Sequence, residues 1–158
     1  LAFISSKLLK KTPLAPGWFG ADNPFDMNTK ILSMAENARR YTQATMSYIS
    51  VVGLNESILE LIKLKLTKIR DHSQSLSETL FFGLKGSNWT SYRDLSNTEA
   101  SPHIISLTNK NAKSSMILKK LKLKNVVCSD RNNRIRISLA HYNNEQDIKN
   151  LLTILNNE

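Results

Sequence analysis

One arginine near the C-terminal end of the chain has a side chain and a position suited to binding an anion. Residues 134–144 read Arg-Ile-Arg-Ile-Ser-Leu-Ala-His-Tyr-Asn-Asn, so Arg134, Arg136 and Ser138 alternate with apolar residues. This alternation is typical of a β-strand with one buried and one polar face. An arginine held mid-strand usually has an anion to bind, because its planar guanidinium matches a carboxylate or phosphate. Arg136 is therefore a candidate anion-binding residue, with a salt bridge on the sheet face as the alternative.

A second candidate anion site precedes a predicted helix. Residues 40–45 read Arg-Tyr-Thr-Gln-Ala-Thr. Hydroxyl groups and free backbone amides ahead of a helix suit an oxyanion such as phosphate. A threonine in this position is more often only a helix cap, so Thr45 alone does not establish a site.

The elements that position these residues follow from the hydrophobic periodicity. The expected elements are a strand at 1–5, a loop at 12–24, a long helical region at 48–84 with a break near 64–68, a strand at 103–108, a helix at 114–121, a strand at 126–128, a strand from 134 and a C-terminal helix after Asn143 and Asn144. The expected fold class is α/β of the α+β type. It has a small antiparallel sheet of about three strands, covered by helices on one face and preceded by a long connecting helix.

The composition leaves a nucleic-acid partner to consider. The 158 residues carry a net charge of +9, from 22 Lys and Arg against 13 Asp and Glu. The basic residues are spread along the chain, and the one local cluster, Lys119 to Lys124, has no interleaved aromatic residues to stack bases. A solvated helix face explains this cluster, so nucleic acid is not the expected partner, although a basic nucleic-acid-binding domain stays open as an alternative.

The cysteine and histidine residues indicate neither a disulfide nor a metal site. Cys128 is the only cysteine, which fits a reducing compartment such as the cytoplasm, and it is expected to be a small buried residue in a strand. The three histidines lie far apart in the sequence without partner cysteines at zinc-site spacing. No apolar run approaches the ~20 residues that cross a bilayer, so no membrane partner is expected.

A family resemblance appears in the C-terminal segment. Arg136-Ile-Ser138, followed by His141-Tyr-Asn-Asn144 and an acidic helix start, resembles the C-terminal signature of class V aminotransferases. These are pyridoxal-phosphate enzymes that include cysteine desulfurases and lyases. The resemblance implies the C-terminal domain of the aspartate-aminotransferase-like fold, with Arg136 binding the α-carboxylate of an amino-acid substrate.

The segment before the long helix also resembles this family. Residues 40–45 are similar to the family pattern Arg-Phe-Glu-x-Gly-Thr, and a Gly-Trp pair such as Gly17-Trp18 recurs upstream of it. The resemblance implies that Thr45 binds the phosphate of pyridoxal 5'-phosphate in the neighbouring subunit of a homodimer. Thr42 and Ala44 depart from the pattern, since the family usually has glutamate and glycine there.

The family's cofactor lysine has no counterpart in this sequence. No His-Lys pair occurs, so no catalytic residue is assigned, and the chain resembles only the C-terminal part of a typical member. Residues 1–47 are expected to be the edge of the large cofactor domain, and residues 48–158 the small domain. Because the first residue is leucine, the chain is expected to be processed or to be a fragment of a longer protein.

The function implied by the resemblance belongs to the complete protein. It is pyridoxal-phosphate chemistry on an amino acid, such as transamination, elimination or epimerisation, in a cytoplasmic homodimer. Desulfurases of the family use a loop cysteine before the arginine, and the expected strand position of Cys128 argues against that chemistry. A non-catalytic structural or interaction module is the other alternative.

Overall fold

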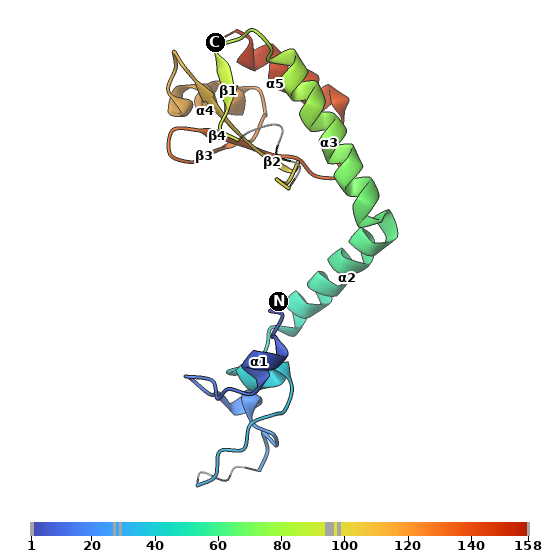
Figure 1. Cartoon of the computed structure of the whole chain (residues 1–158), viewed down its shortest axis with the longest axis vertical. Coiled ribbons are helices and arrows are strands. Elements are labelled where there is room, and N and C mark those ends of the chain that lie inside the picture. Colours follow the sequence, from blue (N-terminus) through green and yellow to red (C-terminus); the bar gives the residue numbers. More distant parts are fainter. Residues whose placement is uncertain (1, 27, 29, 94–96, 98, 158) are drawn as a thin grey trace. The chain divides into compact units, whose positions relative to one another are not determined.

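The protein divides into two compact units, which are described separately. The computed structural model describes residues 2–26, 28, 30–93, 97 and 99–157. One unit comprises Leu1–Ile58 and the other Leu59–Glu158 (Figure 1).

The first unit is built mainly from loops and short helices. It contains the α-helix α1 (Ser6–Leu9), the 3-10 helices η1 (Trp18–Gly20) and η2 (Ala38–Tyr41), and the first part of α2 (Tyr48–Leu64). The strand expected at residues 1–5 was wrong: Leu1 lies outside the described residues, and the following residues lead into α1. Ser5 caps this helix instead, because its hydroxyl accepts a hydrogen bond from the Leu8 amide.

The long helical region is interrupted near the expected position. α2 ends at Leu64, and α3 (Leu66–Gly83) begins after Lys65. Lys65 has a φ of 67°, a left-handed conformation that cannot continue an α-helix. The break expected within 64–68 is therefore confirmed.

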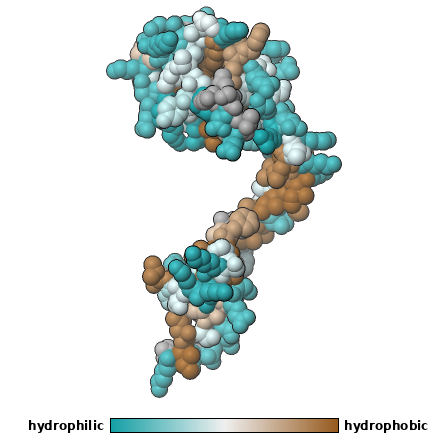
Figure 2. Space-filling model, viewed as in Figure 1, coloured by the Kyte–Doolittle hydropathy of each residue, from teal (hydrophilic) through white to brown (hydrophobic). Residues whose placement is uncertain are grey.

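The surface of α2 is unusually apolar. None of its residues is buried, and Figure 2 shows hydrophobic residues along it. The large apolar side chains that it exposes are Tyr48, Ile49, Val51, Val52, Leu54, Ile58, Leu59, Leu61, Ile62 and Leu64. Among the described residues, no helix is both long and apolar enough to cross a membrane. A helix that is apolar on most sides is usually covered by protein.

The second unit contains an antiparallel sheet. In the described residues it has four strands in the order β1-β2-β4-β3, comprising β1 (Trp89–Ser91), β2 (Ile104–Asn109), β3 (Ser129–Asp130) and β4 (Ile135–Ser138). About three strands were expected, and β1 is the additional one. The strand expected at 126–128 is also displaced, because the residues that pair with β4 are Ser129 and Asp130.

Helices cover one face of this sheet, as the sequence predicted. α3 and α5 (Glu145–Leu155) pack together, and α4 (Ser114–Leu123) packs on α5 and β3. Ile105 and Leu107 of β2 and Ile135 and Ile137 of β4 point into the shared core. The helices contribute Leu76, Leu80, Ile117, Leu121, Ile148, Leu151 and Leu155. The α/β fold of the α+β type is confirmed.

The turn from β4 into α5 is fixed by asparagine side chains. The Asn144 side chain accepts hydrogen bonds from the amides of Gln146 and Asp147, and the Asp147 carboxylate accepts one from the Asn144 amide. The Asn143 side chain accepts another from the Ala140 amide at 2.9 Å. This capping box fixes the start of α5 directly after the strand that carries Arg136.

Candidate functional site

Arg136 lies in the middle of the sheet, on the face away from the helices. In β4 it is paired with Ser106 of β2 and Ser129 of β3. Ile135 and Ile137 on either side point into the core, so strand alternation places Arg136 on the opposite face. Its side chain is half-buried, and its Nε is buried without a hydrogen-bond partner in the described part of the chain. Buried donors are usually hydrogen-bonded, so this Nε–H can donate to an acceptor on a ligand.

The surroundings of Arg136 are polar, and no described carboxylate forms an ion pair with it. Ser106 and Ser138 share its face, and the hydroxyls of Thr90 and Thr108 bond each other at 2.8 Å. The carboxylate of Asp130 accepts from the Ser114 hydroxyl of α4. No ion pair of Arg136 with Asp or Glu occurs within the described residues. The salt-bridge alternative is therefore not realised within these residues.

A second arginine shares this face, in an arrangement that the sequence did not predict. The guanidinium carbon of Arg134 lies 3.8 Å from the ring centroid of Tyr92, directly after β1. The alternation of Arg134 and Arg136 predicted that both lie on the polar face, but not what either contacts there. The stack could not be predicted, because it depends on β1 pairing with β2.

The three histidines make structural contacts. His141 Nε2 lies 3.4 Å from Glu60 Oε1, and His72 Nε2 lies 2.7 Å from the Asn143 carbonyl oxygen. His103 Nδ1 lies 2.9 Å from the hydroxyl of Ser73. These contacts connect the loops beside β2 and β4 to the helices, and so help to hold the Arg136 strand in place.

In the first unit, the segment before α2 lies against the Gly-Trp loop. A Cβ on Gly17 would overlap the backbone of Gln43, and a Cβ on Gly20 would lie 2.6 Å from the Arg40 carbonyl oxygen. Arg39 also holds the loop, because its Nη1 donates to the Phe19 carbonyl oxygen at 3.0 Å. The sequence gave no signal for this role of Arg39. The loop and the segment leading to Thr45 are thus fixed together.

Thr45 is exposed in the loop between η2 and α2. Its hydroxyl makes no hydrogen bond among the described residues, so it is free to bind a ligand. An exposed hydroxyl on a fixed segment ahead of a helix fits a contact to a phosphate group. Thr45 and Arg136 lie in different units.

Cys128 is placed differently from its expected position. It lies just before β3 and is half-buried against the core, so the expected strand position was wrong and no longer argues against a nucleophilic cysteine. Burial raises the pKa of this thiol from 9.0 to about 11, because desolvation disfavours the thiolate. The structural role expected for Cys128 agrees with this environment.

Three known proteins show what the chain is similar to. The uncharacterized aminotransferase YcbU of Bacillus subtilis is 25% identical over 142 residues, which are 89% of this chain and 35% of YcbU. The structure of the cysteine desulfurase CsdA of Escherichia coli has a TM-score of 0.81 at 16% identity. The match covers 97% of this chain and 40% of the CsdA chain. The apo structure of the cysteine desulfurase of Thermococcus onnurineus NA1 has a TM-score of 0.84 at 15% identity. The match covers 98% of this chain and 41% of the desulfurase chain.

The chain spans about two-fifths of the length of these solved structures, and their likeness shows the shared fold. A further structure of the same fold is a variant of C-DES with glycine covalently linked to its PLP cofactor, at a TM-score of 0.78 and 20% identity. A family model described as aminotransferase class-V matches residues 1–151, nearly the whole chain. The chain therefore belongs to the class V aminotransferase family, whose cofactor is pyridoxal phosphate.

Proposed function

We propose that this chain is the C-terminal part of a pyridoxal-phosphate enzyme that acts on an amino acid. The observation that supports this most directly is the guanidinium of Arg136. It lies half-buried on the face of the sheet away from the helices, with an unpartnered Nε and no ion pair among the described residues. In the proposed function, Arg136 binds the α-carboxylate of the substrate through two parallel hydrogen bonds.

Binding the carboxylate at Arg136 orients the rest of the amino acid. Pyridoxal phosphate, when bound, supplies the electron sink that stabilises negative charge at the α-carbon. The part that this chain contributes is to fix the carboxylate, and hence the direction of the bonds at that carbon. Ser106 and Ser129, which flank Arg136 on the sheet, keep the surroundings of the guanidinium polar.

Thr45 is proposed to contact the cofactor phosphate of a partner subunit in a homodimer. Its free hydroxyl and the packing of Gly17 and Gly20 against its segment support this role. The exposed apolar surface of α2 supports the existence of a covering partner, because such a surface is usually buried in an interface. A second copy and the remainder of a longer protein would both help to cover it.

Among the reactions of the family, the environment of Cys128 favours those that need no protein thiolate. Its raised pKa leaves little thiolate at neutral pH. Transamination, elimination or epimerisation of an amino acid is therefore proposed, and Cys128 is not proposed as a sulfur acceptor.

The experiment that tests this function compares an amino acid with its decarboxylated amine. The complete protein is loaded with pyridoxal phosphate, and the cofactor absorbance is recorded during titration with alanine or with its matching amine, ethylamine. The same comparison is then made for each of the other amino acids and its amine. A saturable change with at least one amino acid, and at least a tenfold weaker response to the matching amine, is expected. Equal responses to every such pair would show that the carboxylate is not recognised.

A further inference from the structure

We propose that Arg134, held over the ring of Tyr92, forms a second anion subsite beside Arg136. The substrate would then be an amino acid whose side chain carries its own acidic group. This inference rests on the proposed function, because it requires Arg136 to bind the α-carboxylate.

Arg136 lies in β4, and Arg134 directly precedes the first residue of that strand. Ile135 lies between them and is buried in the core. Strand alternation places Arg136 on the other side of the sheet, and the stack on Tyr92 places the Arg134 guanidinium there too. Alternate residues of a strand are separated by roughly 7 Å. Both side chains are half-buried. Two guanidinium groups carried by neighbouring positions on one face of a sheet can each bind one end of a short dicarboxylate.

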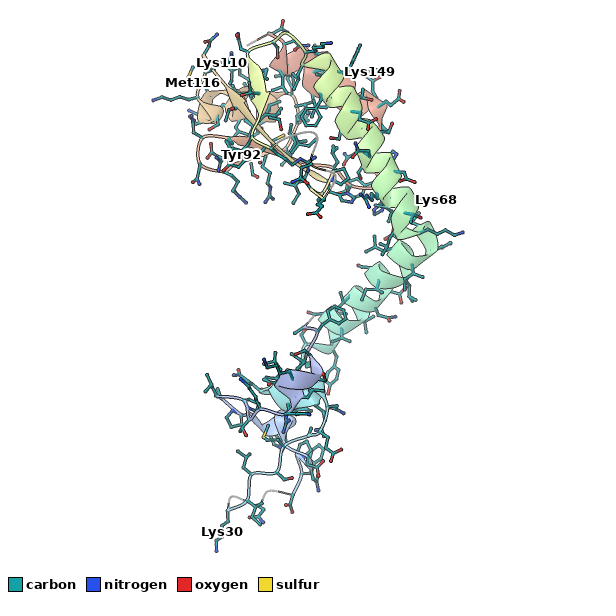
Figure 3. All side chains as sticks on the ribbon, viewed as in Figure 1. Lys30, Lys68, Tyr92, Lys110, Met116 and Lys149 are labelled. Carbon is teal, nitrogen blue, oxygen red and sulfur yellow. The ribbon has the colours of Figure 1, made fainter. Side chains whose placement is uncertain are left out.

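Tyr92 determines how Arg134 is presented. The ring lies 3.8 Å from the guanidinium carbon, and the Tyr92 amide donates to the Ser106 carbonyl oxygen at 2.9 Å. This bond anchors Tyr92, which Figure 3 labels, beside the sheet. Stacking on a ring uses the flat face of the guanidinium and leaves the N–H groups at its edge free. The structure thus fixes the arginine without occupying its hydrogen-bond donors.

The charges on this face lack an internal counterion. In the described residues, neither Arg134 nor Arg136 forms an ion pair, and the Arg134 side chain makes no hydrogen bond. Arg131 of the preceding turn differs, because its Nη1 donates to the Asp130 carbonyl oxygen at 2.7 Å. Two neighbouring positive charges in a partly buried site repel each other, and a ligand with two negative charges removes that repulsion.

A purely structural role for the stack makes a different prediction. In that case Arg134 would only attach Tyr92 to the sheet, and its loss would lower the stability of the protein. It would not change the preference between ligands with one and two carboxylates. The ratio of these two affinities therefore separates the roles.

The test measures the affinity of succinate and of propionate for the complete, cofactor-loaded protein by isothermal titration calorimetry. The wild type is expected to bind succinate at least tenfold more tightly than propionate. In R134Q, succinate should lose about tenfold in affinity, whereas propionate should change by less than twofold. R131Q is the matched control and should leave both affinities unchanged.

The result for R136Q separates a failure of this inference from a failure of the proposed function. R136Q should weaken both ligands by at least tenfold, and unchanged affinities would contradict the proposed function itself. If R136Q weakens both but R134Q leaves the ratio at the wild-type value, only the second subsite is overturned. Should R134Q fail to fold, R134K must still lower the ratio, and an unchanged ratio overturns the subsite equally.

Discussion

Gly17 lies so close to the backbone of Gln43 that no side chain fits between them. Gly20, at the other end of the same loop, is packed in a similar way on the Arg40 carbonyl group. The loop and the segment that leads to Thr45 therefore depend on each other for their positions. A phosphate contact at Thr45 would depend on this packing, although neither glycine needs to touch the ligand.

Replacing Gly17 with alanine should weaken cofactor binding. The added methyl group overlaps the Gln43 backbone, so the segment before α2 must move. In the complete protein, the affinity for pyridoxal phosphate should fall by at least tenfold, as measured by titration of the cofactor absorbance.

Gly53→Ala is the matched control for this variant. Gly53 lies inside α2, and a Cβ there meets nothing within 4 Å. Alanine is favoured over glycine in a helix by ~0.8–1 kcal/mol, so the melting temperature should stay equal or rise. If G17A retains the cofactor affinity of G53A, the packing of Gly17 on Gln43 does not support the site.

The Cys128 thiol should react slowly in the folded protein. Its pKa of about 11 lies above the value of 9.0 for a free thiol, so the fold favours the neutral form. Near pH 8, alkylation by iodoacetamide should be roughly tenfold or more slower in the folded than in the urea-unfolded protein. The stabilisation from the neutral thiol is complete below the unfolded pKa near 9 and declines as the pH rises towards 11.

The C128A variant checks the same point through activity. Since Cys128 is not proposed as a nucleophile, this variant should keep kcat within about twofold of the wild type. Complete loss of activity in a folded C128A protein would show that the thiol takes part in the reaction.

Asn144→Ala should destabilise the second unit. The substitution removes the hydrogen bonds from the Asn144 side chain to the amides of Gln146 and Asp147. The expected loss is about 0.5–2 kcal/mol in the free energy of unfolding, measured by urea denaturation. Asn150→Ala, on the exposed surface of the same helix, should cost less than ~0.5 kcal/mol. Equal losses in the two variants would exclude a specific effect of the cap.

The basic charge should not produce binding to nucleic acid. Lys119 and Lys122 of α4 and Lys124 directly after it are all exposed, and they have no aromatic residue beside them in the sequence. Mixed-sequence RNA should show no measurable binding at low salt in a fluorescence anisotropy titration. Binding that weakens steeply with added salt would instead support the nucleic-acid alternative.

The sequence predicted the elements whose periodicity is strong. β4 was predicted because Ile135 and Ile137 alternate with polar residues, and the break at Lys65 because the helical region was too long for one helix. β1 was missed because a three-residue strand shows no clear alternation. The offset at β3 arises because pairing with β4, and not the apolar residues before it, determines which residues form the strand.

The candidate site was predictable only where one segment carried the pattern. Arg136 was singled out by its position in an alternating strand, and Thr45 by the resemblance of its segment to the family pattern. The stack of Arg134 on Tyr92 and the packing of Gly17 on Gln43 join residues far apart in the chain. Such contacts depend on the tertiary fold and leave no local signal.

The measurement that tests the role of Arg136 most directly is the affinity of the complete, cofactor-loaded protein for a simple carboxylate such as propionate, compared between the wild type and R136K. Lysine keeps the charge but loses the planar pair of donors, so the affinity should fall by about tenfold, with the melting temperature nearly unchanged. An affinity that is the same in the wild type, R136K and R136Q would show that Arg136 does not bind the carboxylate.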